Sequence, residues 1–242
     1  MKEILRVLIQ RIRTILFPKF RQYYQKLPYI ITVVIALVLV LGCINLFVEL
    51  TATLKTETLA SYDHQITQYV IAHRSPSITK YFKFMTEVGD VNGYLIVLGI
   101  SVLLTILVFK RWKYIAQITL VLLLATISNM MLKRFIDRAR PGIEHLVVVK
   151  TLSYPSGHAM SAMAFYGFLM YLVYKFKMNI ILKSVLFIFL ILFVLSIGIS
   201  RIYLGVHFPS DIAGGFIAGM IWVFFCILIF NLVEVFRKDP LT

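Results

Sequence analysis

Two histidines, an aspartate and three basic residues in the second half of the chain are of the types that phosphoryl chemistry uses. His207 and Asp211 are four residues apart, so on a helix they would lie one turn apart on the same face. A carboxylate beside an imidazole fixes its tautomer and stabilises the imidazolium, which leaves the other ring nitrogen free to attack. Such a pair alone is more often a structural hydrogen bond. Its position near Arg201 favours a nucleophile.

A second histidine, His158, follows Pro155, Ser156 and Gly157 at the predicted start of an apolar helix. The first amides of a helix are unpaired and its dipole favours anions, so backbone N–H groups of this segment could bind phosphate oxygens. The imidazole of His158 could then protonate a leaving alkoxide, a contribution of roughly 10²–10⁴-fold. The alternative is a simple helix cap at Ser156, and both interpretations can hold together.

The three basic residues Lys133, Arg140 and Arg201 are predicted to hold the phosphate. Phosphoryl transfer depends on positioning and on neutralising charge on the phosphoryl oxygens. Arginine can contact two oxygens at once, whereas lysine acts as a point charge. The alternative is snorkelling, in which basic residues at the ends of apolar segments reach towards lipid headgroups. Three cations that converge with two histidines are hard to explain by snorkelling.

These polar residues fall into three clusters, at residues 133–141, 155–158 and 200–211, which lie at the ends of apolar segments long enough to cross a bilayer. Of the 242 residues, 60% are hydrophobic and the mean hydropathy is +0.87. Soluble domains contain nearer ~45–50% apolar residues, and a helix needs ~20 of them to span a membrane. We therefore predict an all-α integral membrane bundle of six transmembrane helices. The predicted spans are residues 27–48, 91–109, 114–132, 157–174, 180–199 and 210–236.

The segments outside these spans suggest two further features. Residues 1–26 are predicted to form a basic amphipathic cytoplasmic segment on an anionic leaflet, with a frayed tail as the alternative, and residues 27–242 to form the membrane domain. Residues 49–90, called the cap segment here, are predicted to form one or two external surface helices. Cys43 and Cys226 each lie inside an apolar span, and we expect both to be unpaired.

The distribution of charge predicts the orientation in the membrane. The net charge is +14, but most basic residues flank apolar spans, which argues against nucleic acid as a partner. Cytoplasmic loops collect Lys and Arg. With six spans, this rule predicts a multi-pass plasma-membrane protein with both termini in the cytoplasm. The cap segment and the three polar clusters then lie on the extracellular or periplasmic side.

Together, the three polar clusters resemble the signature of the type 2 phosphatidic acid phosphatase family. The chain contains K-x6-RP at residues 133–141, PSGH at 155–158 and SR-x5-H-x3-D at 200–211, in that order. The resemblance implies that His207 attacks phosphorus and carries a phosphohistidine, that Asp211 orients it, and that His158 protonates the leaving group and later activates water. It also implies metal-independent chemistry without a cofactor. The residues that would hold the phosphate are Lys133, Arg140, Ser156, Gly157 and Arg201.

The sequence agrees with metal independence in that no cluster of carboxylates for a two-metal site is visible. Asp137 and Glu144 are the acids near the clusters before Asp211, and we interpret both as partners in loop salt bridges.

The resemblance implies a lipid phosphate or diphosphate as the substrate, with membrane lipids around it. Phosphatidylglycerophosphate, undecaprenyl diphosphate and phosphatidic acid are the candidates, and the sequence does not choose among them or set an oligomeric state. A vanadate-dependent haloperoxidase has a similar anion pocket, but it is soluble. Two alternatives stay open: a transferase that passes a phosphoryl or head group between lipids, and a non-catalytic lipid transporter.

Overall fold

The computed structural model describes residues 27, 30–104, 112–149 and 151–237, which contain helices and no strand. The predicted all-α class is therefore confirmed. Residues 40–223 form one compact unit, and the described residues before 40 and after 223 belong to another. Every candidate site residue belongs to the first unit. The basic segment predicted for residues 1–26 lies outside the described residues.

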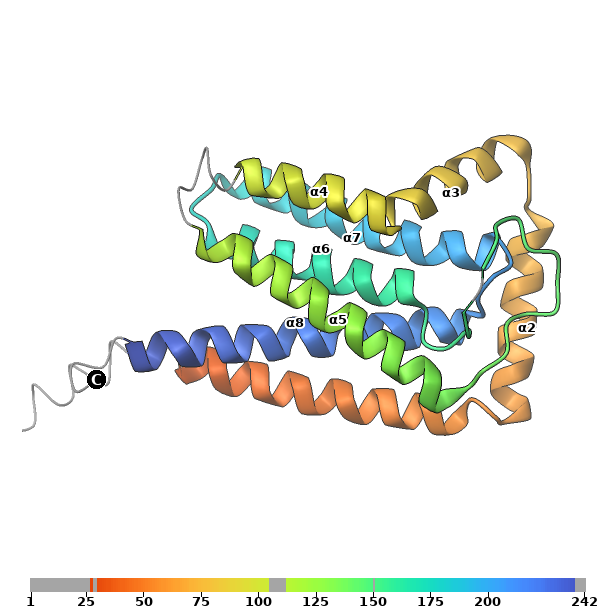
Figure 1. Ribbon diagram of the computed structural model, residues 1–242, viewed down its shortest axis with the longest axis horizontal. Coiled ribbons are helices and arrows are strands. Elements are labelled where there is room, and N and C mark those ends of the chain that lie inside the picture. The colour runs from red at the N-terminus through yellow and green to blue at the C-terminus, as the bar shows by residue number, and fades with distance from the viewer. Residues whose placement is uncertain (1–26, 28–29, 105–111, 150, 238–242) are drawn as a thin grey trace, which may run out of the picture. The chain divides into compact units, whose positions relative to one another are not determined.

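The described helices follow one another through the whole chain. The first is Ile30–Thr53. It is followed by α2 (Glu57–Ala72), α3 (Pro76–Val88), α4 (Val91–Leu104), α5 (Lys113–Ile136), α6 (Gly157–Lys175), α7 (Ile180–Tyr203) and α8 (Pro209–Arg237). Within residues 40–223, α6 lies between α5 and α7, and α2 runs crosswise at the end where α5 finishes and α6 begins (Figure 1).

Four of the described helices are long and apolar enough to cross a membrane, or five if the bent pair α3 and α4 counts as one span. Those four are Ile30–Thr53, α5, α7 and α8. The helix α6 is long enough but is not among them. Many of its buried residues are small or polar, as expected for a helix that packs against other helices rather than lipid. The predicted number of six spans stays a prediction.

The cap segment contains α2 and α3. The helix α3 joins α4 at a break with a bend of 64°, and together the pair is long and apolar enough to form a broken span or a re-entrant loop. The predicted surface position of the cap segment stays a prediction. The second span was predicted to start at residue 91, and its predicted end at residue 109 lies outside the described residues. The break at Gly89 and Asp90 becomes important because it faces the site.

Close backbone packing between α6 and α8 fixes the start of α6. A Cβ added at Gly215 would lie 2.7 Å from the carbonyl oxygen of Ser156, and one at Gly219 would lie 2.7 Å from that of Met160. Real side chains do not fit at such distances, so glycine at both positions lets the two helices approach. The PSGH segment is thereby held against the first turns of α8.

Backbone hydrogen bonds close the loop of residues 137–156 on itself and tie it to the end of α7. It begins where Asp137 adopts a left-handed conformation with φ of 46° and ends α5. The amide of Leu146 then donates to the carbonyl of Leu204 over 3.0 Å, and the amide of Ser153 donates to that of Arg138 over 2.9 Å. These bonds hold the loop beside the end of α7.

Candidate active site

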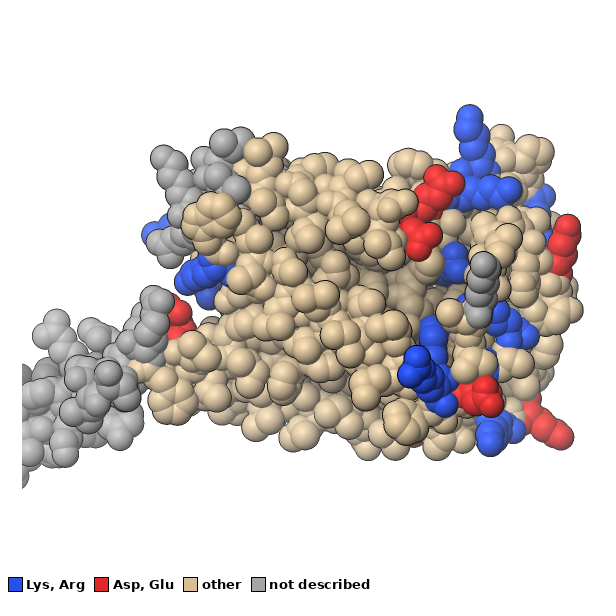
Figure 2. All heavy atoms as spheres, viewed as in Figure 1, with Lys and Arg blue, Asp and Glu red and all other residues tan. Residues whose placement is uncertain are grey.

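The three polar clusters meet at one cavity of about 690 Å³, between the α3–α4 break, α5, α6, α7 and the loop of residues 137–156. Figure 2 shows many of the Lys, Arg, Asp and Glu side chains gathered near one end of the molecule, whereas the flanks of the helices in this view carry almost none. The predicted site residues that line the cavity are Lys133, Arg140, Gly157, His158, Arg201 and His207. Ser156 and Asp211 are buried outside this lining.

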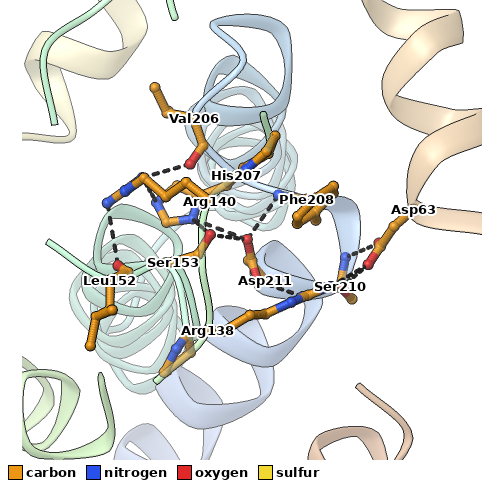
Figure 3. A network of polar contacts seen from close by, with 12 residues as sticks. Asp63, Arg138, Arg140, Leu152, Ser153, Val206, His207, Phe208, Ser210 and Asp211 are labelled. Carbon is orange, nitrogen blue, oxygen red and sulfur yellow. Dashed lines mark hydrogen bonds and ion pairs between the residues drawn. The ribbon is translucent and has the colours of Figure 1, made fainter. Parts of the chain in front are cut away.

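His207 is held with one ring nitrogen against Asp211 (Figure 3). The distance from His207 Nδ1 to Asp211 Oδ2 is 3.3 Å, and the same oxygen accepts hydrogen bonds from the Ser153 hydroxyl and from the Phe208 amide at 2.8 Å. His207 precedes α8, which begins at Pro209, so the pair is formed by the turn into the helix rather than by one helical turn. The other nitrogen, Nε2, is left for the cavity.

Burial controls the protonation of this imidazole. Loss of hydration lowers the pKa of His207 to about 3, although the hydrogen bond and the charge of Asp211 oppose the shift. The neutral ring with its proton on Nδ1, facing the carboxylate, has an electron pair on Nε2 that accepts a hydrogen bond from Arg140. That nitrogen lies 3.2 Å from an Arg140 Nη1 atom. The predicted nucleophile and the guanidinium predicted to bind phosphate therefore lie side by side in the cavity lining.

Two of the cations are held by main-chain carbonyl groups of the loop and, for Arg140, also by that of Val206 between α7 and α8. Lys133 Nζ donates to the Leu152 carbonyl and, at 3.2 Å, to Thr151 Oγ1. Arg140 donates to the carbonyls of Thr151 and Val206, each at 2.6 Å. Burial lowers the pKa of the Arg140 guanidinium, and the charge of Asp211 opposes this shift. Uncharged carbonyl partners leave both cations with charge to offer to a phosphate.

Arg201 lies in the last turn of α7, because this helix extends to Tyr203, beyond its predicted end at residue 199. Its Nη1 atom donates to Thr86 Oγ1 of α3 over 2.5 Å. Its Nε–H is buried and has no hydrogen-bond partner among the described residues. An unpaired buried donor on a cation is costly. A phosphate oxygen is a suitable acceptor for it.

His158 stands at the start of α6 across the cavity and has a carboxylate neighbour that sequence spacing did not indicate. Its Nε2 lies 3.7 Å from Asp90 Oδ1 at the α3–α4 break. Gly89 packs against the ring, since an added Cβ would lie 3.2 Å from His158 Cδ2. The α3–α4 break therefore lies against the residue predicted to be the general acid.

The PSGH segment is used differently from the expectation at one position. The amide of Ser156 donates to the carbonyl of Asp211 over 3.0 Å, so this N–H group is already engaged. The Ser156 hydroxyl is buried and has no partner among the described residues. A role for Ser156 in phosphate binding stays a prediction, and it would depend on the hydroxyl. Gly157 lines the cavity as expected.

Several residues of the site escaped the sequence reasoning. Arg138 donates to Asp211 Oδ1 over 2.7 Å and to Asp63 Oδ2 over 2.8 Å (Figure 3). Arg138 lies two residues before Arg140 in the first cluster, which was a usable signal. Asp63 and Asp90 come from the cap segment, where no local pattern marks them. Glu144 approaches Arg74 at 4.0 Å, whereas Asp137 ends α5.

Within the described part of the chain, no group of three or more His, Cys, Asp or Glu side chains could hold a metal ion. Cys43 and Cys226 are both buried and unpaired, as expected.

Comparison with known families decides the relationship of this chain. Residues 114–234, which contain all three clusters, match the PAP2 superfamily. The chain is also 30% identical to phosphatidylglycerophosphatase B of Bacillus subtilis (strain 168) over 181 residues, which is 74% of this chain and 88% of that protein. The chain belongs to the PAP2 superfamily. A PAP2 relation was predicted from the three motifs and is confirmed.

Other relatives agree with this PAP2 assignment. The crystal structure of a transmembrane PAP2-type phosphatidylglycerolphosphate phosphatase from Bacillus subtilis matches with a TM-score of 0.74 and 27% identity, over 84% of this chain and 98% of that one. LpxE of Aquifex aeolicus matches with a TM-score of 0.54 and 25% identity, over 70% and 93%. Lipid A 4'-phosphatase of Bacteroides thetaiotaomicron is 29% identical over 145 residues, 52% of this chain and 61% of that protein. The predicted class, a membrane-bound PAP2-type lipid phosphatase, is confirmed at this level.

Proposed function

We propose that this PAP2 protein hydrolyses a lipid phosphate or diphosphate through a phosphohistidine intermediate on His207, without a metal ion. The observation that carries the proposal is the cavity in which Lys133, Arg140 and Arg201 meet His207 and His158. Phosphatidylglycerophosphate is the first candidate substrate, because two of the relatives are named for it. Undecaprenyl diphosphate and phosphatidic acid are the other candidates.

The proposed reaction has two steps. His207 Nε2 attacks phosphorus, the bond from phosphorus to the leaving oxygen breaks, and His158 gives a proton to that oxygen. His158 then takes a proton from water, which attacks the phosphohistidine and releases inorganic phosphate. Asp211 stabilises the positive imidazole ring of the phosphohistidine, which the first step forms and the second step returns to the neutral state. The three cations neutralise charge on the phosphoryl oxygens.

A lipid substrate is supported by the apolar residues of the cavity wall. Val91, Met130 and Val148 line the cavity and also have large exposed fractions of 68%, 54% and 88%. Exposed apolar side chains around a cluster of cations suit a molecule with a hydrocarbon tail and a phosphate head.

We further propose that the site faces the extracellular or periplasmic side of the plasma membrane. The helix α5 runs from Lys113 to the site, and α6 runs from the site to Lys175. Basic residues therefore mark the helix ends remote from the cavity, which is the pattern of a cytoplasmic side. The two termini are proposed to lie on that side as well.

The decisive experiment measures phosphate release by the purified protein in detergent from the three candidate lipids, with and without EDTA. Activity is expected to persist in EDTA and to be blocked by vanadate, which adopts the five-coordinate geometry of in-line attack. Loss of activity in EDTA that magnesium restores would contradict metal independence. Transfer of the phosphoryl group to an added acceptor alcohol, with no phosphate released in its absence, would favour the transferase. No reaction of any lipid, with or without the alcohol, would favour the transporter.

A further inference from the structure

The cap helix α2 docks through two buried polar residues as well as through apolar ones such as the partly buried Val70. Its buried residues are Asp63 and Thr67, and Asp63 is only 2% exposed. Burying a carboxylate is costly unless it is paired and hydrogen-bonded. A helix that needed only to be attached could use apolar residues. The carboxylate on the docking face therefore calls for a separate explanation.

Both carboxylate oxygens of Asp63 accept hydrogen bonds, and Ser210 at the start of α8 donates to each of them. Its Oδ1 accepts the Ser210 amide at 2.9 Å, and its Oδ2 accepts the Ser210 hydroxyl and Arg138 Nη2. Each oxygen only accepts hydrogen bonds, which is the pattern of an ionised carboxylate. The guanidinium of Arg138 also lies over the Phe208 ring, 4.7 Å from its centroid. Arg138 thus has a fixed place between α2 and the turn that carries His207 (Figure 3).

The other edge of Arg138 reaches the carboxylate that orients His207. Arg138 Nη1 donates to Asp211 Oδ1 at 2.7 Å, which leaves Oδ2 to face His207 Nδ1. Asp63, Arg138 and Asp211 together carry one positive and two negative charges, a net charge of −1. That sum balances one imidazolium. Without Asp63, the remaining pair would be neutral and would stabilise the imidazolium less.

We propose that Asp63 and Arg138 are positioning residues of the reaction, through which the cap helix fixes both the orientation and the effective charge of Asp211. Neither residue lines the cavity, so neither contacts the phosphate. A buried ion pair is weak support for fold stability, because desolvation offsets the attraction. Its charge acts instead on the step that makes His207 positive. This inference rests on the proposed role of His207 as the nucleophile.

The test compares kcat and KM for p-nitrophenyl phosphate, a readout that does not depend on which lipid is the substrate. Asp63→Asn keeps the size and the acceptor for the Ser210 amide but removes the charge. It is expected to lower kcat by roughly tenfold or more while KM stays within about twofold. Asp63→Glu, which keeps the charge, is expected to retain more activity. The matched control is Thr67→Val on the same face of α2, whose hydroxyl has no partner among the described residues, and its kcat should be unchanged.

A double-mutant cycle separates charge from packing. Arg138→Gln alone leaves two carboxylates without their cation, whereas Asp63→Asn with Arg138→Gln restores a net charge of −1 at Asp211. The double variant should therefore be more active than the product of the single effects predicts. Arg138→Lys keeps the charge but cannot contact both carboxylates, so it should also lower kcat at constant KM.

Three results would overturn the proposal: wild-type kcat in Asp63→Asn, an equal loss of kcat in Thr67→Val, or single effects that multiply in the double variant. If Asp63→Asn does not fold, Arg138→Lys decides, and an unchanged kcat in that variant overturns the proposal. A wild type that is active on p-nitrophenyl phosphate but on no lipid would contradict the proposed substrate class and leave this comparison intact.

Discussion

At the scale of single residues, the two cavity histidines differ in their surroundings. His207 is buried between Asp211 and Arg140, with several hydrogen bonds that fix the neighbouring carboxylate. His158 begins a helix and has the exposed Asp90 at 3.7 Å. The first environment suits an oriented nucleophile, and the second suits a proton donor near the leaving oxygen.

This difference predicts distinct effects of the two substitutions. His207→Ala should abolish hydrolysis of every substrate, because the covalent step is lost. His158→Ala should retain a larger fraction of wild-type activity on p-nitrophenyl phosphate than on a lipid monophosphate, because p-nitrophenolate leaves without a proton. The measurement is the rate of phosphate release by each variant relative to the wild type, taken with both substrates. If the better leaving group rescues His207→Ala instead, the two roles are reversed.

The pKa of His207 makes a prediction about stability. An unfolded histidine takes up a proton near pH 6.5, but in the folded protein burial lowers the pKa to about 3. Between these values the unfolded state binds the additional proton, so this residue lowers the free energy of unfolding as pH falls. The stability of the wild type relative to His207→Gln should therefore decrease by up to ~1.4 kcal/mol per pH unit below 6.5. Denaturant unfolding in detergent at pH 7, 5.5 and 4.5 measures it, and parallel curves would contradict it.

At the scale of elements, two irregular segments complete the site between regular helices. The loop of residues 137–156 supplies the carbonyl groups that hold Lys133 and Arg140. The α3–α4 break supplies Asp90 and the close packing of Gly89 against His158. Helices give these segments fixed anchor points, and the segments place the reactive groups.

The break at Gly89 predicts a position-specific effect of adding one methyl group. In Gly89→Ala, the new Cβ would lie 2.7 Å from Ile197 Cγ2 and 3.2 Å from His158 Cδ2. It should displace His158 and lower activity on a lipid monophosphate more than on p-nitrophenyl phosphate. The control is Gly99→Ala in α4, where a Cβ meets nothing within 4 Å. This change should keep activity and stabilise the helix by ~1 kcal/mol or less. Equal losses of activity in Gly89→Ala and Gly99→Ala would contradict a specific effect of the contact between Gly89 and His158.

At the scale of the whole molecule, the proposed orientation predicts the accessibility of two loops. A cysteine at Glu144, beside the site, should react with an impermeant thiol reagent in intact cells, and one at Lys177, after α6, should not. Both parent residues are exposed, and the native Cys43 and Cys226 are buried, so they can be replaced to give a cysteine-free background. The reverse labelling pattern would place the active site in the cytoplasm.

Sequence alone determined the helical membrane class, the three motifs and the family, because these depend on composition and on spacing within a few residues. It also identified six of the residues that line the cavity. It could not reveal Asp63, which meets Ser210 across 147 positions of sequence, or Asp90 beside His158. It also missed the engagement of the Ser156 amide by Asp211. Such contacts are decided by how the helices pack and where they break, and no local periodicity encodes which buried carboxylate meets which distant donor.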